Sequence, residues 1–372
     1  MKALALKPVA SFQDQLAAYK QAIDADIAAY RKHVLATTAE QYGEYAALIT
    51  DVYFDILSRG GKRLRGSLVM TGYEMCGGRD QTMIVRAATA MEMLHAYMLI
   101  IDDIQDRSTL RRGKPAAHEM LAAYHRRHHL RGDSMHAGVS LGLNAALSGA
   151  HAAHMLLAGL SVPDEYKVKV LGIVNLTMVI TAHGQTYDIM NEIQPEVPAI
   201  NIDRALEWKT AHYTFLNPLC VGMVLAGAGC EDTNAIRDYA LSTGKAFQIA
   251  DDIAGVFGKK TVTGKGAGSD IVTGKRTLLI THALAQAEPA DKHFLNKCLG
   301  NSSLSAANLD RCRRIIMASG ALDYAREIRD GHIAQALEAL HIHQRRWPAG
   351  NVRFLRQLAQ QLTKEQGFLL VT

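Results

Sequence analysis

The sequence predicts an all-α protein, a single large helical bundle that spans the chain. Alanine is abundant, whereas aromatic residues make up only 6% of the 372 residues, a composition that favours helices over sheets. Only eight prolines occur, and several stand where a helix would begin or end, such as Pro115, Pro163 and Pro218. With 48% hydrophobic residues, the chain can bury one large core.

Apolar spacing and Gly, Pro or Asp punctuation delimit the expected helices. These lie near residues 12–36, 44–58, 64–76, 81–107, 116–129, 137–161, 164–190, 201–227, 232–257, 276–287, 303–318, 321–341 and 351–366. We expect one domain over residues 1–372, with an N-terminal helix in residues 1–40 and a peripheral C-terminal helix in residues 346–372. Two stretches are expected to be loops, and each supplies cations directly after an acidic motif: Arg111–Pro115 and Gly258–Lys275.

Charge and cysteine content narrow the kind of protein. The net charge of +5 (41 Lys and Arg, 36 Asp and Glu) is too mild to indicate nucleic acid as a partner. The basic stretch Tyr124–Arg131 has few aromatic neighbours, so we interpret it as a solvated helix end or flap near the mouth of the bundle. The first fifteen residues are too poor in apolar side chains for a signal peptide, and no long apolar run predicts a membrane span. Five scattered cysteines favour neither disulfides nor zinc and indicate the cytoplasm.

The most informative segment is an apolar run that ends in three aspartates. Residues 90–101 are apolar apart from Glu92 and His95, and Asp102, Asp103 and Asp106 follow. Residues four apart share a helix face, so Asp102 and Asp106 lie together with Asp103 beside them. Such carboxylates repel one another, and a divalent cation removes this cost; oxygen-only ligands suit magnesium. A solvated helix end with incidental acids is the alternative, which the apolar run disfavours.

Cations flank this motif on both sides. Lys62 and Arg65 follow paired glycines and can converge on one anion, although a glycine turn with solvated charges is the simpler interpretation of that segment alone. Arg111 and Arg112 stand just beyond the third aspartate, where they can grip a phosphate that the metal bridges. His95 lies two turns before the aspartates on the same face, either to donate to a second phosphate or as a buried structural histidine.

A second apolar helix repeats this arrangement. It ends in Asp251 and Asp252, with Gln248 about one turn earlier, and the loop beyond carries Lys265 and Lys275. Two acid pairs on separate, facing helices would form a cage for several magnesium ions around one diphosphate. Each feature alone is weak, but their order along one chain is specific.

These motifs resemble those of the trans-isoprenyl diphosphate synthases, the polyprenyl synthetase family. The segments that carry the resemblance run in the family's order from Gly60 to about Lys275: GGKRLR, DDIQD, RRGKPAAH, GQTYD, a Lys-Thr pair, FQIADDI and GSDIVTGKRT. The resemblance implies an isoprenoid synthase bundle with a deep central cavity and a homodimer. It also implies a magnesium-dependent enzyme that joins isopentenyl diphosphate to an allylic diphosphate.

The resemblance further implies roles for the matching positions. Those that bind isopentenyl diphosphate are matched by Lys62, Arg65, His95 and Arg112. Those that hold the allylic diphosphate are matched by Arg111, Lys209, Thr210, Gln248, Lys265 and Lys275. Ligands of an expected three magnesium ions are matched by Asp102, Asp106 and Asp251, supported by Asp103 and Asp252. The implied catalytic set comprises these aspartates with Arg111, Arg112, Lys209 and Gln248, and the reacting carbons would be bordered by Gln185 and Asp188.

The implied reaction begins when the cations neutralise the departing diphosphate. The double bond of isopentenyl diphosphate then attacks the allylic cation, a proton is lost, and the apolar interior excludes water. Tyr97 would lie about 7.5 Å deeper than Asp102 along the helix axis and could form the floor for the growing chain, with ordinary core packing as the alternative. Met98 beside it is more flexible. An aromatic residue here resembles archaeal-type geranylgeranyl diphosphate synthases, so we expect a C20 product, with C15 as the runner-up.

Several positions depart from the family pattern. Gly255 replaces the last aspartate of the second motif, Leu147 replaces an expected aspartate, Lys259 and Lys260 replace an acidic pair, and Gly66 replaces the more usual proline. These departures keep a non-catalytic subunit as an alternative, although the aspartates and arginines that such a subunit would lose are present. A terpene cyclase also uses aspartates and magnesium but does not need the isopentenyl-binding cations. Farnesyl diphosphate synthase is the remaining alternative.

Overall fold

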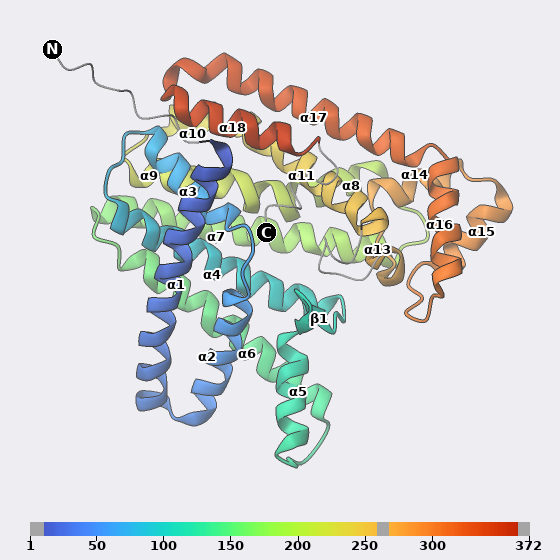
Figure 1. Cartoon of the computed structure of the whole chain (residues 1–372), viewed down its shortest axis with the longest axis horizontal. Coiled ribbons are helices and arrows are strands. Elements are labelled where there is room, and N and C mark those ends of the chain that lie inside the picture. Colours follow the sequence, from blue (N-terminus) through green and yellow to red (C-terminus); the bar gives the residue numbers. More distant parts are fainter. Residues whose placement is uncertain (1–10, 259–267, 364–372) are drawn as a thin grey trace.

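The computed structural model describes residues 11–258 and 268–363. Within these ranges the regular elements are helices, apart from one two-stranded antiparallel hairpin that pairs Leu110 with Pro115 and Arg111 with Lys114. Figure 1 shows the helices gathered into one bundle, with α4 running through its middle. The all-α prediction is confirmed.

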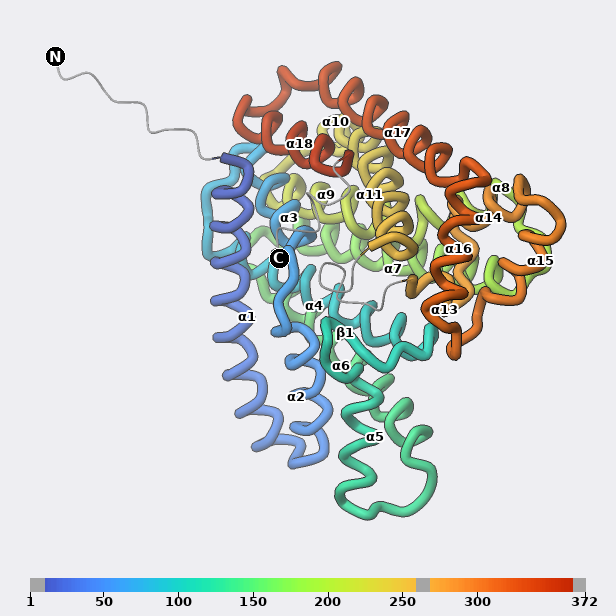
Figure 2. Tube along the Cα trace, turned by 45° about the vertical axis from the view of Figure 1, so that its right-hand side comes forward, coloured from blue at the N-terminus to red at the C-terminus, as the bar shows by residue number. Residues whose placement is uncertain are grey.

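The elements of the first half lead from the bundle's edge to its centre. They are α1 (Phe12–Tyr42), α2 (Glu44–Ser58), α3 (Leu64–Met75), α4 (Gln81–Gln105), β1 (Leu110–Arg111), β2 (Lys114–Pro115), α5 (Ala117–Arg127), α6 (Ser134–Ala158) and α7 (Asp164–Ile193). α1 and α2 form one long hairpin, and the pair α5 and α6 projects from the body in two different views (Figures 1 and 2).

The second half completes the bundle and adds a cluster of short helices at one end (Figure 2). Its elements are α8 (Ala199–Arg204), the π-helix η1 (Ala205–Leu216), α9 (Asn217–Leu225), α10 (Cys230–Ala235), α11 (Arg237–Phe257), α13 (Ser269–Thr273), α14 (Leu278–Gln286), α15 (Pro289–Cys298), α16 (Ala306–Ala318), α17 (Ala321–His343), the 3₁₀ turn η2 (Gln344–Arg346) and α18 (Ala349–Gln361). α17 packs along α11.

Short polar side chains cap the N-termini of several of these helices. Ser11 and Asp14 form a reciprocal capping box at the start of α1, in which each side chain binds the other's backbone N–H. The carboxylates of Asp80 and Asp133 accept hydrogen bonds from backbone N–H groups in the first turns of α4 and α6. These contacts satisfy donors that have no partner within the helix.

Two apolar cores hold the bundle together. The larger one centres on α4, where small residues such as Ala87 and Ala88 let neighbouring helices approach closely. The second lies between α11 and the short helices α13–α16. The inner face of α18 belongs to the larger core through the buried Phe354, Leu355 and Leu358. One described helix, α4, is long and apolar enough to cross a membrane by length and composition alone, but 61% of its apolar window is buried in the fold, as in a core helix.

Five local predictions needed correction. The expected loop Gly258–Lys275 contains the short helix α13, and the helix expected over residues 232–257 is divided into α10 and α11. The single helix expected over residues 201–227 is three elements, with the π-helix η1 in the middle. The expected loop Arg111–Pro115 forms the hairpin β1–β2. Helix α15 was not predicted, because its polar ten residues show little apolar periodicity; Pro289 in its first turn was the available signal.

Candidate active site

A cavity of about 260 Å³ lies between α4, α7, η1 and α11. Its wall combines an apolar part with acidic and basic side chains. The lining residues are Arg65, His95, Met98, Leu99, Ile101, Asp102, Gln105, Arg111, Thr181, Gln185, Lys209, Thr210, Tyr213, Thr214, Phe247, Gln248, Asp251, Asp252, Asp270 and Lys275. Residues from Arg65 to Lys275, far apart in the sequence, thus meet at one polar hollow within the bundle.

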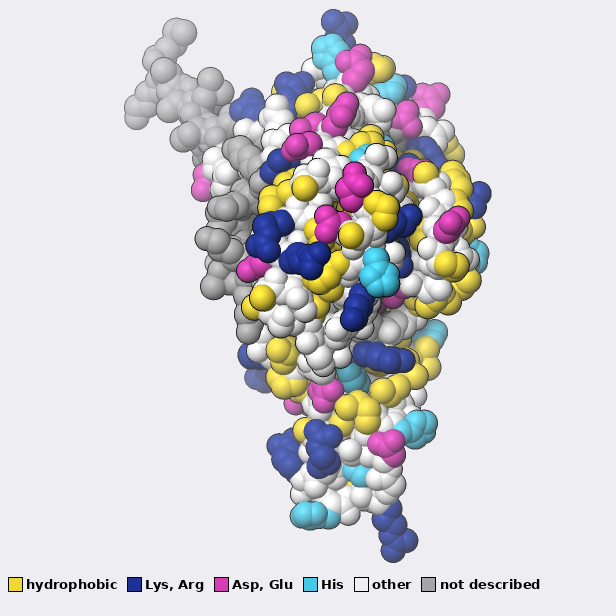
Figure 3. Space-filling view, turned by 90° about the vertical axis from the view of Figure 1, so that its right-hand side faces the viewer, with side chains coloured by type: hydrophobic (Ala, Val, Ile, Leu, Met, Phe, Trp, Pro, Cys, Tyr) yellow, Lys and Arg dark blue, Asp and Glu magenta, His cyan; other side chains and the backbone are white. Residues whose placement is uncertain are grey.

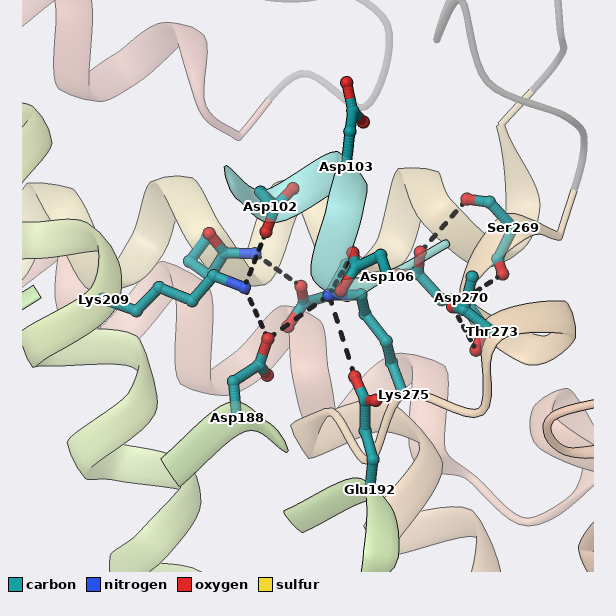
Figure 4. A network of polar contacts seen from close by, with 12 residues as sticks. Asp102, Asp103, Asp106, Asp188, Glu192, Lys209, Ser269, Asp270, Thr273 and Lys275 are labelled. Atoms are coloured by element: carbon teal, nitrogen blue, oxygen red, sulfur yellow. Dashed lines mark hydrogen bonds and ion pairs between the residues drawn. The ribbon is translucent and has the colours of Figure 1, made fainter. Parts of the chain in front are cut away.

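The first acidic motif divides its carboxylates between two directions. Asp102 and Asp106 point toward Lys209 and Lys275, whereas Asp103 points away from them (Figure 4). Asp103 is fully buried and accepts hydrogen bonds from Nε of Arg111 at 2.9 and 3.0 Å. Nη2 of Arg111 lies 3.3 Å from Oδ2 of Asp102. Asp103 therefore orients Arg111 at the cavity wall, while Asp102 and Asp106 face the polar centre.

Two lysines occupy the space between carboxylates of different helices. Lys209 on η1 donates to Asp188 on α7, and its Nζ lies 3.4 Å from Oδ1 of Asp102. Nζ of Lys275 lies 3.2 Å from Asp106 and 3.3 Å from Asp188. Burial would raise the pKa of Asp188, but these two ammonium groups hold it at about 2. The site thus pairs negative and positive groups in a largely buried space.

The π-helix η1 brings Lys209 and Thr210 close to α7. A Cβ on Gly184 would lie 2.1 Å from the backbone N of Lys209, so only glycine allows this approach of the two helices. A π-helical stretch is rare and often occurs at functional sites. Here it sets both Lys209 and Thr210 on the cavity wall.

The second acidic motif shows one exposed and one buried carboxylate. Asp251 is exposed on the cavity wall, whereas Asp252 is buried. Thr210 donates to Gln248 at 2.7 Å, and Gln248 donates to Asp252 at 2.7 Å. Burial, together with the negative charges of Asp270 and Asp251, raises the pKa of Asp252 well above its usual range. The region has an excess of carboxylates that a cation would relieve.

On the other side of the cavity, cations surround an aromatic ring. Nη2 of Arg65 donates to Oγ1 of Thr214 at 2.7 Å, and its guanidinium lies 4.3 Å from the centre of the Tyr213 ring. Nδ1 of His95 lies 2.7 Å from the Tyr213 hydroxyl. Burial and nearby arginines keep the pKa of His95 well below its usual range, so the ring is neutral. Burial also lowers the pKa of Lys62 to about 8.

The loop before α3 is held by a buried ion network. Arg63 has a left-handed backbone with φ of +51°, and its Nε donates to Asp24 at 2.7 Å. The backbone N–H of Gly66 donates to Oε1 of the buried Glu92 at 2.9 Å, a bond that proline could not make. A Cβ on Gly66 would also lie 2.7 Å from Cδ1 of Ile23. The structure therefore explains why glycine rather than proline occupies position 66. The same contacts hold the loop that carries Lys62 and the start of the helix that carries Arg65 against α4.

Most of the predicted site residues lie in or beside this cavity. Asp103 and Asp106 are not among its lining residues but adjoin it, since Asp103 binds Arg111 and Asp106 binds Lys275. Lys62 and Arg112 are also outside the lining; Arg112 donates to the carbonyl of Gly60 in the loop before α3. Met98 lines the cavity, whereas Tyr97 is half-buried against the larger core. Lys259, Lys260 and Lys265 lie outside the described residues. Three residues of the site were not predicted from the sequence: Asp270, Glu192 and Tyr213. For Asp270 a clue was available, because Gly255 lacks the carboxylate expected at the end of the second motif and another acid could supply it.

The carboxylates at the cavity suit a magnesium ion in their chemistry. They offer oxygen ligands alone, on two separate helices. Burial first, and the nearby carboxylates of Asp270 and Asp251 after it, raise the pKa of Asp252, and a bound cation would offset the part due to like charge. Within residues 11–258 and 268–363, no three His, Cys, Asp or Glu side chains already surround one point. Lys209 and Lys275 lie between the acids instead. The residues therefore fit the ion by donor type, with the two lysines as additional cations at the same place.

A helical bundle in which two aspartate-bearing helices and a ring of cations enclose a partly apolar cavity defines a trans-prenyltransferase. The family model described as polyprenyl synthetase matches residues 46–316, and the chain belongs to this family. The family is magnesium-dependent in general. This family accounts for the order of the motifs along the chain.

Named relatives and solved structures agree with this assignment. The chain is 31% identical to geranylgeranyl diphosphate synthase of Saccharolobus solfataricus over 78% of this chain and 83% of the relative. It is 30% identical to geranylfarnesyl diphosphate synthase of Aeropyrum pernix over 77% of this chain and 84% of the relative. A geranylgeranyl pyrophosphate synthase of Corynebacterium glutamicum, solved with isoprenyl diphosphate and magnesium, superposes with a TM-score of 0.85 at 26% identity, covering 96% of this chain and all of the other.

Proposed function

We propose that this chain is a geranylgeranyl diphosphate synthase, which condenses isopentenyl diphosphate head-to-tail with allylic diphosphates. The observation that carries this proposal is the facing of two aspartate-bearing helices, α4 and α11, across one cavity whose polar end holds Lys209 and Lys275. Similarity to two archaeal geranylgeranyl diphosphate synthases at 30–31% identity supports the product class.

In this proposal the allylic diphosphate binds at the polar end of the cavity. Its oxygens are held by Arg111, Lys209, Thr210, Gln248, Lys275 and, outside the described residues, Lys265. Asp102, Asp106 and Asp251 would hold the expected three magnesium ions, which when bound would supply positive charge beside the leaving diphosphate. Lys209 and Lys275 add cations that already lie half-buried beside the acids, where electrostatic stabilisation is stronger than in water.

Isopentenyl diphosphate would occupy the opposite side, where Lys62, Arg65, His95 and Arg112 lie. Arg65 is pre-oriented by Thr214 and the Tyr213 ring, so little side-chain entropy is lost when it binds a phosphate. The neutral His95 can donate one hydrogen bond without adding charge.

The length of the product would be set where α4 faces the apolar part of the cavity. We propose that Tyr97 and Met98 limit the growing chain at C20. Met98 lines the cavity, and Tyr97, the preceding residue of α4, is half-buried against the larger core. Family membership alone does not fix the length, since relatives include a geranylfarnesyl diphosphate synthase at 30% identity and the octaprenyl diphosphate synthase of Escherichia coli at 26%.

We also propose that the protein is a cytoplasmic homodimer that pairs through α6 and α7. Both helices expose large apolar side chains on their outer faces: Leu143, Leu147 and Met155 on α6, and Val168, Leu176 and Val179 on α7. Several exposed large apolar side chains on two neighbouring helices are typical of a protein interface. Leu147, which replaces an expected aspartate, is 56% exposed in the middle of this face, so a role at the interface explains the departure.

Product analysis tests the proposed function. Purified protein is incubated with magnesium, isopentenyl diphosphate and dimethylallyl, geranyl or farnesyl diphosphate in turn, and the products are separated by chain length. A dominant C20 diphosphate is expected. A C15 product would mean a farnesyl diphosphate synthase, and cyclic hydrocarbons would mean a terpene cyclase. A folded protein that elongates no starter would have to be a non-catalytic subunit.

A further inference from the structure

The end of the α5–α6 pair projects from the bundle and is not explained by the proposed function. We call residues 124–136 the tip. All side chains from Arg126 to Asp133 are exposed, as are Met135 and His136. In Figure 3 this lower end of the molecule carries Lys, Arg and His side chains, with an acidic side chain and apolar side chains above them. The tip is thus an exposed, positively charged extremity.

The charges of the tip have almost no acidic compensation. It contains three arginines and four histidines, Arg126, Arg127, Arg131, His125, His128, His129 and His136, and one acid, Asp133. The Asp133 carboxylate accepts hydrogen bonds from the backbone N–H groups of Met135 and His136 as the N-cap of α6. Within the described residues, the tip arginines form no ion pair, and Arg126 and Arg127 contact only a hydroxyl and a carbonyl. Their positive charge is therefore available to a partner.

The tip is a defined structure rather than a loose loop. The N–H of Leu130 donates to the carbonyl of His125 and that of His129 to Arg126, so α5 ends in a Schellman motif with His129 in the left-handed conformation. Nε2 of His125 donates to the carbonyl of Arg131 at 3.0 Å. The rings of Tyr124 and His128 lie 4.1 Å apart. These contacts hold the arginines on one rigid turn.

Two apolar side chains stand among these cations. In a Schellman motif the residue at the Leu130 position commonly packs back on the helix. Leu130 instead remains 49% exposed, and Met135 is 39% exposed. An exposed leucine at this position does not contribute to packing of the helix end, so its side chain is free to contact a partner.

We propose that the tip docks the protein on the surface of an anionic lipid bilayer. Clustered arginines are attracted to anionic headgroups, and exposed apolar side chains beside them can enter the boundary between headgroups and acyl chains. A nucleic acid would also attract the arginines, but the leucine and methionine at the apex favour a lipid surface over a polyanion without an apolar layer. The proposal concerns a peripheral contact and does not depend on the length of the product.

Vesicle flotation of the full chain tests this proposal. The vesicles contain phosphatidylcholine alone or with about one third phosphatidylglycerol, at low and at high salt. The tip variant is Arg126→Gln/Arg127→Gln/Arg131→Gln, and Leu130→Ser tests the apolar contact separately. The matched control, Lys32→Gln/Arg314→Gln/Arg345→Gln, removes the same charge from exposed cations on α1, α16 and the turn after α17. Circular dichroism and turnover in solution check that each variant is folded.

The expected result is binding to anionic vesicles at low salt, with loss of binding at high salt and on neutral vesicles. Removal of each tip arginine should weaken partitioning roughly fivefold, and Leu130→Ser should weaken it without changing the salt dependence. The control triple should bind like the parent. Equal weakening in both triple variants, or no binding of the parent to anionic vesicles, would overturn the proposal. So would binding of single-stranded nucleic acid through the same arginines when Leu130→Ser has no effect on vesicles.

Discussion

A Cβ on Gly255 would lie 2.1 Å from Oδ2 of Asp270. Gly255 stands where the family pattern has the last aspartate of its second motif, and α13 places the carboxylate of Asp270 in the space that this side chain would need. Asp270 also lines the cavity. A side chain at position 255 is therefore incompatible with this position of Asp270, whose carboxylate lies at this point instead.

Restoring the family aspartate at this position should damage the protein. Gly255→Asp would force Asp270 to move and would add a like charge beside it, so we expect lower activity and a loss of about 1–3 kcal/mol in unfolding free energy. Gly255→Ala separates the steric part and should show a smaller loss. Gly331→Ala in α17 is the control, because no atom lies within 4 Å of its Cβ position; it should gain up to about 1 kcal/mol. A Gly255→Asp variant with higher activity than the parent would contradict this interpretation.

Removal of the buried charge at Asp252 should stabilise the metal-free protein. The raised pKa of Asp252 means that the folded protein holds this proton at a higher pH than the unfolded chain does. Stability therefore falls as pH rises from about 4 through the folded-state pKa. Asp252→Asn keeps an oxygen that accepts from Gln248 but cannot ionise, so its melting temperature at neutral pH and without magnesium should exceed that of the parent.

The pH dependence provides the control for this prediction. Melting temperatures of parent and Asp252→Asn should converge as the pH falls below about 3, where the parent carboxyl is protonated in both the folded and the unfolded state. Added magnesium and diphosphate should raise the melting temperature of the parent more than that of the variant. A variant that is less stable than the parent at every pH would show that Asp252 is balanced by the neighbouring lysines.

How much of this site the sequence predicts depends on whether a feature is local. The apolar runs that end in Asp102 and Asp251 predict the two helices that carry these residues. The spacing of four alone places Asp102 and Asp106 on one helix face. No local pattern indicates that Lys275 reaches Asp106 and Asp188, because these contacts join segments about ninety to one hundred and seventy residues apart. Likewise, the bond from Gly66 to Glu92 depends on how closely α3 packs on α4. The π-helix η1 is invisible in the sequence, because its residues are compatible with an ordinary α-helix.

Binding of isopentenyl diphosphate should weaken above about pH 8. Burial lowers the pKa of Lys62 to about 8, so its ammonium is present below that value and is lost above it. We expect kcat/KM for isopentenyl diphosphate to fall through this range, mainly through KM. In Lys62→Arg the guanidinium stays charged, so the decline should move to higher pH. The same decline in parent and Lys62→Arg would assign the titration to another group.

The exposed apolar face of α6 and α7 predicts a specific effect on assembly. Leu147→Asp would place a charge in the middle of the proposed homodimer interface and should shift the protein toward monomer in light scattering. Met317→Asp is the control, since Met317 is 49% exposed on the distant helix α16 and should leave the assembly unchanged. A parent protein that is monomeric at micromolar concentration would contradict the interface.

Product length should respond to side-chain volume at two neighbouring positions of α4. If Tyr97 closes the path of the growing chain, Tyr97→Ala opens it and products longer than the parent's should form, one or more five-carbon units at a time. Met98 lines the cavity directly, so Met98→Phe should have the opposite effect and shorten the product. Met98→Leu, which nearly conserves volume, is the matched control and should leave the product unchanged. Chromatography of the dephosphorylated products measures the product length of the parent and of the three variants. If Tyr97→Ala makes products no longer than those of the parent, Tyr97 does not form the floor of the cavity. A shorter product from Met98→Phe in the same experiment would then assign this role to Met98, whose side chain lines the cavity.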